Sequence, residues 1–473
     1  MDSASAQINL TFRWQFLSSV FVTILQLTAL VLLGRYLDFR ELGAYALFQI
    51  IFRFALYVFE PGMFFSLVQR HEYGTPLVNT LIRKQIVILL ISLALLGGLF
   101  FLDLNDDLRT IILPGIVLIL VIGLGALPHS KLILMARQRE IAWIQAVSYL
   151  AEFIWIISAI KLADPLWVFL MALLIRYIFY YGLCFLVSLR TEMRIPQAEI
   201  ADIPTRHIKP SRDQVLSQLL SFLQGQYDTL LITGLFGMNV LGPYNLATEY
   251  SYLAFSKINP LFHKATFPFL SKTIRLGGDS VSIVRNNLSS YLLVMLSVYI
   301  LLWTHREGLL SLAYLEKSTE LARMAAFILV VALIKAVNNI LTGYLLAYGA
   351  ASWVLKWNLV LTIVNYLVCG IFWWIQIKLE VFLIFSIVYS LIFMFAGAYF
   401  LQKFCMKGNS ILDFNILSVM LCVLPIWIAC FSIEHFVTHP LWSVFLSGLA
   451  TLFLIFVFQK QRLLDLLHLK IMR

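Results

Sequence analysis

The hexapeptide Leu241-Gly242-Pro243-Tyr244-Asn245-Leu246 separates two long apolar segments within residues 228–270. We expect these segments to be two membrane helices joined by a tight turn at the hexapeptide. The second segment also carries Glu249, Lys257 and His263, and a charged side chain at the centre of a bilayer costs about 2.5–3.5 kcal/mol on insertion scales. This helix is therefore expected to line a polar path through the membrane.

The composition excludes a soluble globular protein. Hydrophobic residues make up 61% of the chain, charged residues 13%, and the mean hydropathy is +0.88, whereas about a quarter of the residues are charged in soluble domains. The net charge of +10 comes from basic residues in short loops between apolar runs, so it indicates membrane topology and no nucleic-acid partner. The five cysteines lack the spacing of a metal or redox site.

Fourteen apolar runs are long enough to cross a membrane if isolated charges are allowed within them. They predict an all-α integral membrane protein with about fourteen transmembrane helices. The runs are 14–33, 43–68, 85–102, 111–135, 141–160, 166–189, 214–236, 241–270, 288–304, 321–347, 357–377, 381–401, 414–433 and 441–458.

The distribution of Lys and Arg predicts the orientation. With the N-terminus placed inside, the inside segments hold 22 of these residues and the outside segments hold 8. Because Lys and Arg accumulate in cytoplasmic loops, both termini are expected in the cytoplasm. Residues 1–10 lack the basic-then-apolar pattern of a secretory signal, so insertion is expected to begin with the first apolar run.

The chain is expected to consist of two halves. Residues 190–213 are polar and contain prolines, which is typical of a linker. The segment 42–47 is echoed by 241–246 at an offset of 199 residues and six helices, which predicts parallel repeats related by an axis along the membrane normal. The expected parts are an N-terminal six-helix lobe (1–189), a cytoplasmic linker (190–213), a C-terminal six-helix lobe (214–401) with a central cavity between the lobes, and two final helices with a cytoplasmic tail (402–473).

Six predicted helices carry a charged residue near their centre. Charges that merely extend from loops would gather at helix ends, where long side chains reach water, so this placement indicates a function at half depth in the membrane. The six residues are Arg53, Glu152, Arg176, Asp228, Lys257 and Lys335.

One alternative is that these charges only pair with one another. The possible pairs are Arg53 or Arg176 with Glu152 or Glu60, and Lys257 or Lys335 with Asp228. The interior set holds five basic residues against four acidic ones, so no pairing neutralises it. The surplus of positive charge predicts an anionic cargo.

No other chemistry is indicated. The sequence has no Walker loop, and its external His and Asp residues lack the spacing of metal ligands or of an acid/base pair. We therefore expect no catalytic residue, no metal site and no cofactor, and transport driven by a gradient or by the cargo's own concentration difference.

Several stretches resemble the Wzx-type polysaccharide flippases of the MOP transporter superfamily, and its colanic-acid branch in particular. The resemblance covers most of the first 275 residues closely and the rest mainly by helix count. The stretches are residues 32–37 with 41–45, Glu60-Pro61-Gly62 with 67–70, and Asp228 with 230–232, 241–247, Lys257-Ile258-Asn259-Pro260 and Phe267-Pro268.

This resemblance implies a multi-pass protein of the bacterial inner membrane that is not an enzyme. The protein would move an undecaprenyl-pyrophosphate-linked oligosaccharide from the cytoplasmic to the periplasmic leaflet by alternating access, for O-antigen, capsule or exopolysaccharide synthesis. Membrane lipid, a polysaccharide polymerase and a chain-length regulator are the implied partners. The chain is more distantly similar to lipid II flippases, whose cavity uses basic residues of the second and eighth helices, which here would be Arg53, Lys257 and Lys264.

Three roles are predicted for the polar residues inside the membrane. Basic residues are expected to bind the pyrophosphate, acidic residues to bind a coupling proton or sodium ion, and other polar residues to contact the sugar. The basic set is Arg53, Lys257, Lys264, Lys335 and Arg176; the acidic set is Asp228, Glu152, Glu60 and Glu249; the sugar set is Tyr252, Asn259 and His263.

Two other functions fit a polytopic membrane protein. A drug or metabolite exporter of the same superfamily would favour an acidic cavity for cationic cargo, which the basic surplus argues against. A polysaccharide polymerase or ligase would need a large external catalytic loop, and the longest predicted external loop covers only residues 305–320.

Overall fold

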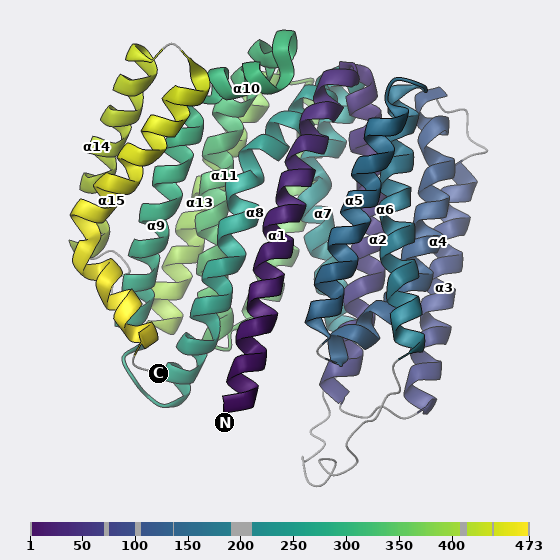
Figure 1. The fold of residues 1–473 in the computed structure, drawn as a ribbon, viewed down its shortest axis with the longest axis horizontal. Helices are drawn as coiled ribbons and strands as arrows, with labels where there is room; N and C mark the ends of the chain where they lie inside the picture. Colours follow the sequence, from purple (N-terminus) through teal and green to yellow (C-terminus); the bar gives the residue numbers. More distant parts are fainter. Residues whose placement is uncertain are drawn as a thin grey trace. The chain divides into compact units, whose positions relative to one another are not determined.

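The computed structural model describes residues 2–70, 75–99, 106–135, 137–190, 211–406, 414–437 and 439–471. Within these ranges the chain forms helices and short connections and contains no strand (Figure 1). The predicted all-α fold is confirmed. Most of the predicted linker, 190–213, lies outside the described residues.

The helices follow the predicted apolar runs and extend most of them by polar turns. The predicted external loop 305–320 contains a further short helix, α10, and one 3₁₀ turn. The helices are α1 (Asp2–Tyr36), α2 (Phe39–Arg70), α3 (Thr75–Leu99), α4 (Asp106–Leu134), α5 (Gln138–Ala159), α6 (Pro165–Leu189), α7 (Ser211–Phe236), α8 (Met238–Arg275), α9 (Ser280–Thr304), α10 (Arg306–Tyr314), α11 (Ser318–Ala347), α12 (Ala351–Ile375), α13 (Leu379–Phe400), α14 (Phe414–Phe436) and α15 (Pro440–Ile471).

Among the described residues, nine helical segments are long and apolar enough to cross a membrane. They lie in α1, α2, α4, α5, α6, α9, α11, α12 and α13, and shorter apolar helices lie in α3, α14 and α15. The helix with the predicted polar path, α8, belongs to neither group, so it needs neighbouring helices to satisfy its polar groups. The total of fourteen crossing helices stays a prediction.

The chain forms two compact units. Unit 1 comprises Met1–Gly242 and Asn358–Ile371, and unit 2 comprises Pro243–Trp357 and Phe372–Arg473. The predicted boundaries of the two lobes, the linker and the final helix pair stay predictions.

In unit 1, α4 packs against α2, α3 and α6, and α5 packs against α1 and α6 (Figure 1). The helix α7 packs on α2 and on the middle of α12. Gln224 Nε2 donates to the carbonyl oxygen of Asn358 at 2.6 Å, and the Tyr366 hydroxyl donates to the carbonyl oxygen of Leu223 at 3.2 Å. Side-chain bonds to helix carbonyls thus join a late segment of the chain to the first unit.

Two glycines bring the first turns of α2 and α8 into backbone contact within unit 1. A Cβ atom at Gly43 would clash with the carbonyl oxygen of Met238, and a Cβ atom at Gly242 would clash with the carbonyl oxygen of Phe39. The two contacts are related by the 199-residue offset of the echoed segments, because Phe39 then corresponds to Met238 and Gly43 to Gly242. The approach is therefore reciprocal, and both sides of it require glycine.

The predicted runs 214–236 and 241–270 correctly place the hexapeptide 241–246 at the start of the second helix, but its assignment as the turn itself is wrong. Helix α7 ends at Phe236 and α8 begins at Met238, so Gly237 alone connects them. Its φ of +77° is in the left-handed region, which glycine adopts without a steric penalty. The hexapeptide instead lies in the first turns of α8, where Gly242 contacts α2.

In unit 2, α9 packs against α11 and α14, α11 packs against α13, and α14 packs against α15 (Figure 1). The core of this unit contains buried side chains such as Ala254 of α8, Tyr291 of α9, Ala336 of α11 and Val419 of α14. Helix α8 is therefore anchored by apolar packing on one side, which leaves its polar side chains to face neighbouring helices or the surface.

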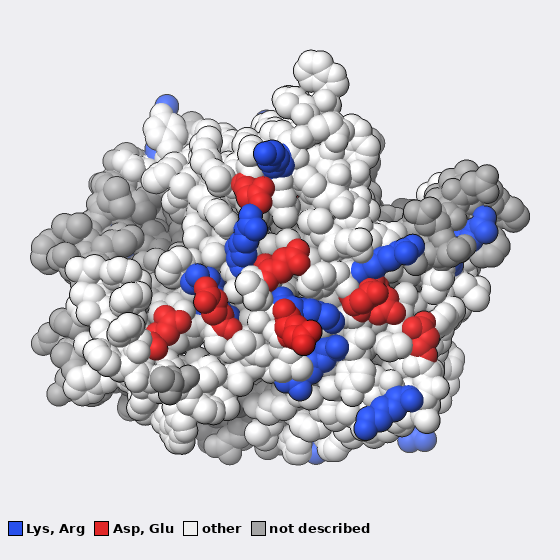
Figure 2. Space-filling model, turned by 90° about the horizontal axis from the view of Figure 1, so that it is seen from above, with Lys and Arg blue, Asp and Glu red and all other residues white. Residues whose placement is uncertain are grey.

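The end of the molecule at which α10 lies is charged. Figure 2 shows Lys and Arg side chains beside Asp and Glu side chains on this face. In unit 2, Arg323 of α11 and Glu380 of α13 form an exposed ion pair of 2.5 Å. Among the described residues on this face, side chains of both signs lie beside one another.

Replacing Gly43 or Gly242 by alanine is expected to destabilise the protein. The added methyl group would meet a backbone oxygen, which cannot move aside as a flexible side chain can, and overpacking of this kind costs about 1–3 kcal/mol or more. Thermal unfolding of the purified variants checks this. Gly225→Ala is the matched control, because a Cβ at Gly225 of α7 meets nothing within 4 Å; a control as unstable as the two test variants would contradict the contact's importance.

Candidate functional site

In unit 2, the structure brings four predicted site residues together in one seam between α8 and α11. Tyr252, Asn259 and His263 lie on one face of α8, because residues seven and four apart recur on the same side of a helix. Lys335 lies on the facing side of α11. Its Nζ atom is 5.6 Å from the centre of the Tyr252 ring, which is within the range of a cation–π contact.

Towards the C-terminal ends of α8 and α11, the seam contains a hydrogen-bonded network around Asn339 of α11. Asn339 Oδ1 accepts from Asn259 Nδ2 at 3.0 Å and contacts His263 Nε2 at 2.7 Å. Behind these residues, the hydroxyl of Tyr291 in α9 donates to Asn259 Oδ1. Three helices are therefore joined by polar side chains at one level.

The network has a closed side and an open side. Tyr291 is fully buried and Asn259 is 3% exposed, whereas Asn339 is exposed and His263 is half-buried. The buried side of this network has its hydrogen bonds made within the protein, and the accessible side can offer its remaining donors and acceptors to a ligand.

A glycine of α11 makes room for the His263 ring. A Cβ atom at Gly343 would lie within 3.0 Å of His263 Cε1 and Nδ1. Because Gly343 follows Asn339 by one helical turn, the imidazole lies against the α11 backbone while its Nε2 reaches the Asn339 side chain.

Lys257 lies on the exposed side of α8. Glu249, two helical turns earlier, is close enough for its charge to act on Tyr314 of α10. Both side chains have interactions with neighbouring groups. The side chains of Glu60 and Lys264 lie outside the described residues, so their predicted roles stay predictions.

Sequence reasoning missed Asn339, Tyr291 and Gly343. Asn339 was detectable, because two consecutive asparagines in an apolar helix, one turn after Lys335, continue the polar face of that helix. Tyr291 and Gly343 carry no such signal, since a buried tyrosine and a helical glycine are ordinary features of packed membrane helices.

In unit 1, Arg176 of α6 and Glu152 of α5 form a buried ion pair. Arg176 Nη1 donates to Glu152 Oε2 at 3.0 Å and to Oε1 at 3.2 Å, and the two side chains are 12% and 9% exposed. The guanidinium carbon is 4.7 Å from the ring centres of Tyr149 and Tyr177 and 5.9 Å from that of Phe52. This is one of the pairings weighed from the sequence, and it satisfies both charges within the fold.

Two other charged residues predicted in unit 1, Arg53 and Asp228, have local partners. Arg53 Nη2 donates to Gln49 Oε1 at 3.3 Å, one turn earlier on α2. Asp228 Oδ1 accepts from the Thr229 amide at 2.8 Å. These contacts place the residues but do not test the predicted binding roles.

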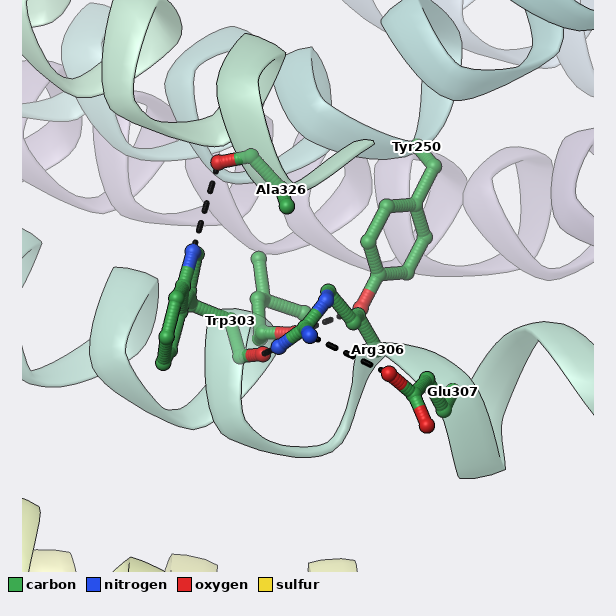
Figure 3. Close-up of polar contacts among 6 residues, drawn as sticks. Tyr250, Trp303, Arg306, Glu307 and Ala326 are labelled. Atoms are coloured by element: carbon green, nitrogen blue, oxygen red, sulfur yellow. Dashed lines mark hydrogen bonds and ion pairs between the residues drawn. The ribbon is translucent and has the colours of Figure 1, made fainter. Parts of the chain in front are cut away.

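Side-chain bonds to carbonyl groups fix the corner where α9 ends (Figure 3). The Tyr250 hydroxyl of α8 donates to the carbonyl oxygen of Leu302 at 2.9 Å, and Arg306 Nη1 donates to that of Trp303 at 2.7 Å. Trp303 Nε1 donates to a carbonyl oxygen of α11 at 3.2 Å. The last carbonyls of a helix have no partner within it, so Tyr250 and Arg306 cap α9 while Trp303 ties it to α11.

His305, next to this corner, joins α15 to the end of α9 within unit 2. Its Nε2 contacts Ser447 Oγ at 2.8 Å and its Nδ1 contacts Ser443 Oγ at 3.2 Å. The residue is 3% exposed, and burial lowers the pKa of the imidazole below its ordinary value. Within the described residues, no group of three or more His, Cys, Asp or Glu side chains could hold a metal ion.

Residues 12–274 match the model of a family described as polysaccharide biosynthesis protein (Polysacc_synt). The chain belongs to this family. Teichuronic acid biosynthesis protein TuaB of Bacillus subtilis (strain 168) is 22% identical over 373 residues, which cover 76% of this chain and 75% of TuaB. Lipopolysaccharide biosynthesis protein WzxC of Escherichia coli (strain K12) is 20% identical over 365 residues, which cover 73% of this chain and 71% of WzxC.

Among solved structures, the fold is similar to that of lipid II flippase MurJ in an inward closed conformation. The TM-score is 0.70 at 12% sequence identity, and the match covers 95% of this chain and 99% of the MurJ chain. This likeness confirms the predicted membrane fold class, and membership of the polysaccharide biosynthesis family confirms the resemblance predicted from sequence motifs.

Glu152→Ala is expected to destabilise the protein by about 3–5 kcal/mol, because it leaves the buried Arg176 guanidinium without its carboxylate. Unfolding of the purified variant measures this. Glu140→Ala is the control, since Glu140 and Arg137 form a pair whose side chains are 40% and 38% exposed, and such pairs contribute about 1 kcal/mol or less. Equal losses in the two variants would contradict a special role for the buried pair.

Acid is expected to destabilise unit 2 through His305. The pKa of His305 is lowered in the folded protein, so below a pH of about 6.5 the unfolded chain binds a proton that the folded one resists. Stability should therefore be constant above about pH 6.5 and fall as the pH drops from there towards the lowered pKa. Melting temperatures of wild type and His305→Asn, whose amide does not titrate, check this; the same acid dependence in both would contradict it.

Proposed function

We propose that this protein is a flippase that moves polyprenyl-pyrophosphate-linked oligosaccharides from the cytoplasmic to the periplasmic leaflet of a bacterial inner membrane, with both termini in the cytoplasm. Family membership supports a step in polysaccharide biosynthesis. The relatives TuaB and WzxC are named for teichuronic acid and lipopolysaccharide biosynthesis, and the fold is that of a lipid II flippase. A common task for such proteins is the transfer of a lipid-linked sugar across the membrane.

The observation that carries the proposal is the seam between α8 and α11. It places Lys335 beside Tyr252, and it places an imidazole and two amides farther along the same two helices. Lysines attract phosphate as compact positive charges, and amides, imidazoles and tyrosines exchange hydrogen bonds with hydroxyl groups. The combination suits a ligand that has a pyrophosphate at one end and sugar hydroxyls at the other.

The remaining roles follow from this cargo. Lys257, Lys335, Arg53 and Lys264 attract the pyrophosphate, while Tyr252, Asn259 and His263 contact the sugar. Asp228, Glu60 and Glu249 bind a coupling proton or sodium ion. For Arg176 and Glu152, the ion pair supports a positional role, so their part in binding or coupling depends on whether the pair opens during transport.

The proposed architecture has an N-terminal lobe (1–189), a C-terminal lobe (214–401) and a final helix pair (402–473) that serve one transport cycle. The lobes enclose a central cavity that opens to one side at a time, while the lipid tail stays in the bilayer. The protein performs no bond-breaking chemistry, and a polymerase and a chain-length regulator act on its product.

Lys257→Ala and Lys335→Ala are expected to reduce export roughly 10- to 100-fold, the range for losing a hydrogen bond to a charged group. The measurement uses a deletion strain complemented with each variant, in which surface polysaccharide and undecaprenyl-linked intermediates are quantified. Intermediates should accumulate on the cytoplasmic side as surface polymer is lost.

Lys161→Ala is the matched control, because Lys161 is exposed between α5 and α6, and it should export normally. Variant abundance is measured in parallel to separate transport from folding. Unchanged polymer and intermediates in the deletion strain would refute the flippase; a loss of drug resistance in that strain would instead support an exporter.

A further inference from the structure

The directions of the hydrogen bonds in the α8–α11 seam can be assigned from the chemistry of the groups. Asn339 Oδ1 can only accept, so the hydrogen shared with His263 must be carried by Nε2 of the imidazole. The same oxygen accepts from Asn259 Nδ2, which leaves Asn259 Oδ1 to accept from the Tyr291 hydroxyl. Both lone pairs of one oxygen are therefore used to orient two side chains of α8.

Gly343 fixes the remaining freedom of the imidazole. With Nε2 held by Asn339, the ring can still rotate about that bond, and contact with the bare backbone at Gly343 stops it. A methyl group at this position would force the ring away from α11, and the bond to Asn339 would lengthen or break. Asn339 and Gly343, one helical turn apart, thus hold the imidazole of His263 in one orientation.

The side of this contact that faces away from Tyr291 is accessible to a ligand. Asn339 is exposed and His263 half-buried, while Tyr291 closes the rear. Tyr252 and Lys335 lie farther along the same seam. At about 1.5 Å of rise per residue, Tyr252 is about 10 Å from Asn259 and about 16 Å from His263 along α8, whereas Lys335 is about 6 Å from Asn339 along α11. A group bound at His263 and a group bound at Lys335 would therefore occupy different levels of the seam.

We propose that Asn339 and Gly343 are positioning residues that orient His263 to bind a hydroxyl group of the sugar. This inference rests on the proposed function, and it assigns the sugar and the pyrophosphate to different parts of the seam. Asn339 and Gly343 act through His263, whose imidazole both of them contact.

The test compares two lipids. The first is the undecaprenyl-linked oligosaccharide extracted from the deletion strain, and the second is undecaprenyl pyrophosphate, which lacks the sugar. Binding of each to the purified full-length protein in detergent is measured by titration. Asn339→Leu and Gly343→Ala should bind the sugar-bearing lipid about tenfold more weakly, as expected for losing one or two neutral hydrogen bonds, and should bind the sugar-free lipid as wild type does.

Three controls separate positioning from folding. Asn339→Asp keeps an oxygen that accepts both hydrogen bonds, so it should restore binding. Gly370→Ala adds a methyl group in α12 where nothing lies within 4 Å, and should bind both lipids normally. His263→Ala and His263→Ala/Gly343→Ala should be equally impaired, because Gly343 matters only while the imidazole is present.

The possible failures can be told apart. Equal weakening for both lipids in Asn339→Leu and Gly343→Ala, or no weakening at all, would overturn the inference. If Asn339→Leu does not fold, the double variant still tests the inference. Losses of binding from His263→Ala and Gly343→Ala that add up in the double variant would also overturn the inference. If wild type binds neither lipid, and Lys257→Ala exports normally, the flippase itself is refuted.

Discussion

The polar face of α8 must be satisfied by the helices around it, because hydrocarbon offers no water to donate or accept hydrogen bonds. Several polar side chains of α8 have a partner on another helix: Tyr250 bonds to the end of α9, Tyr252 contacts Lys335 of α11, and Asn259 is held from both α9 and α11. The same contacts hold α8 in place and orient its side chains. In the α8–α11 seam, residues that stabilise unit 2 and residues proposed to meet a ligand therefore belong to one hydrogen-bonded network.

Positive charge is compensated differently in the two units. In unit 1, Arg176 has a carboxylate at 3.0 Å and three aromatic rings around it, so the fold itself compensates its charge. In unit 2, Lys335 faces a tyrosine ring and Lys257 lies on an exposed helix face. The positive charge that a phosphate can approach is thus expected mainly from the two lysines. A count of interior charges alone overstates the contribution of Arg176 to phosphate binding.

Much of the fold was predictable, because apolar runs and polar helix faces are local properties. The face of α8 at Tyr252, Asn259 and His263 follows from helical periodicity alone. The partner of Arg176 was narrowed to two acidic residues, since the packing order of helices is not a local property. Asn339 was missed because its amide carries no charge, and the sequence pattern that predicted the site was one of charged residues. The turn at Gly237 was missed because a single glycine is too short an interruption to be recognised within an apolar pattern.

The reciprocal approach of α2 and α8 has the symmetry of a contact between two identical subunits. Phe39 and Gly43 in one repeat correspond to Met238 and Gly242 in the other, and each glycine receives the other repeat's carbonyl group. A contact in which the same surface serves both partners is the kind formed by two identical subunits across a two-fold axis. A protein consisting of a single repeat would carry both halves of this contact and could pair with its own copy. In the present chain both halves of this contact lie on one polypeptide, and each glycine leaves the space that the opposite backbone occupies.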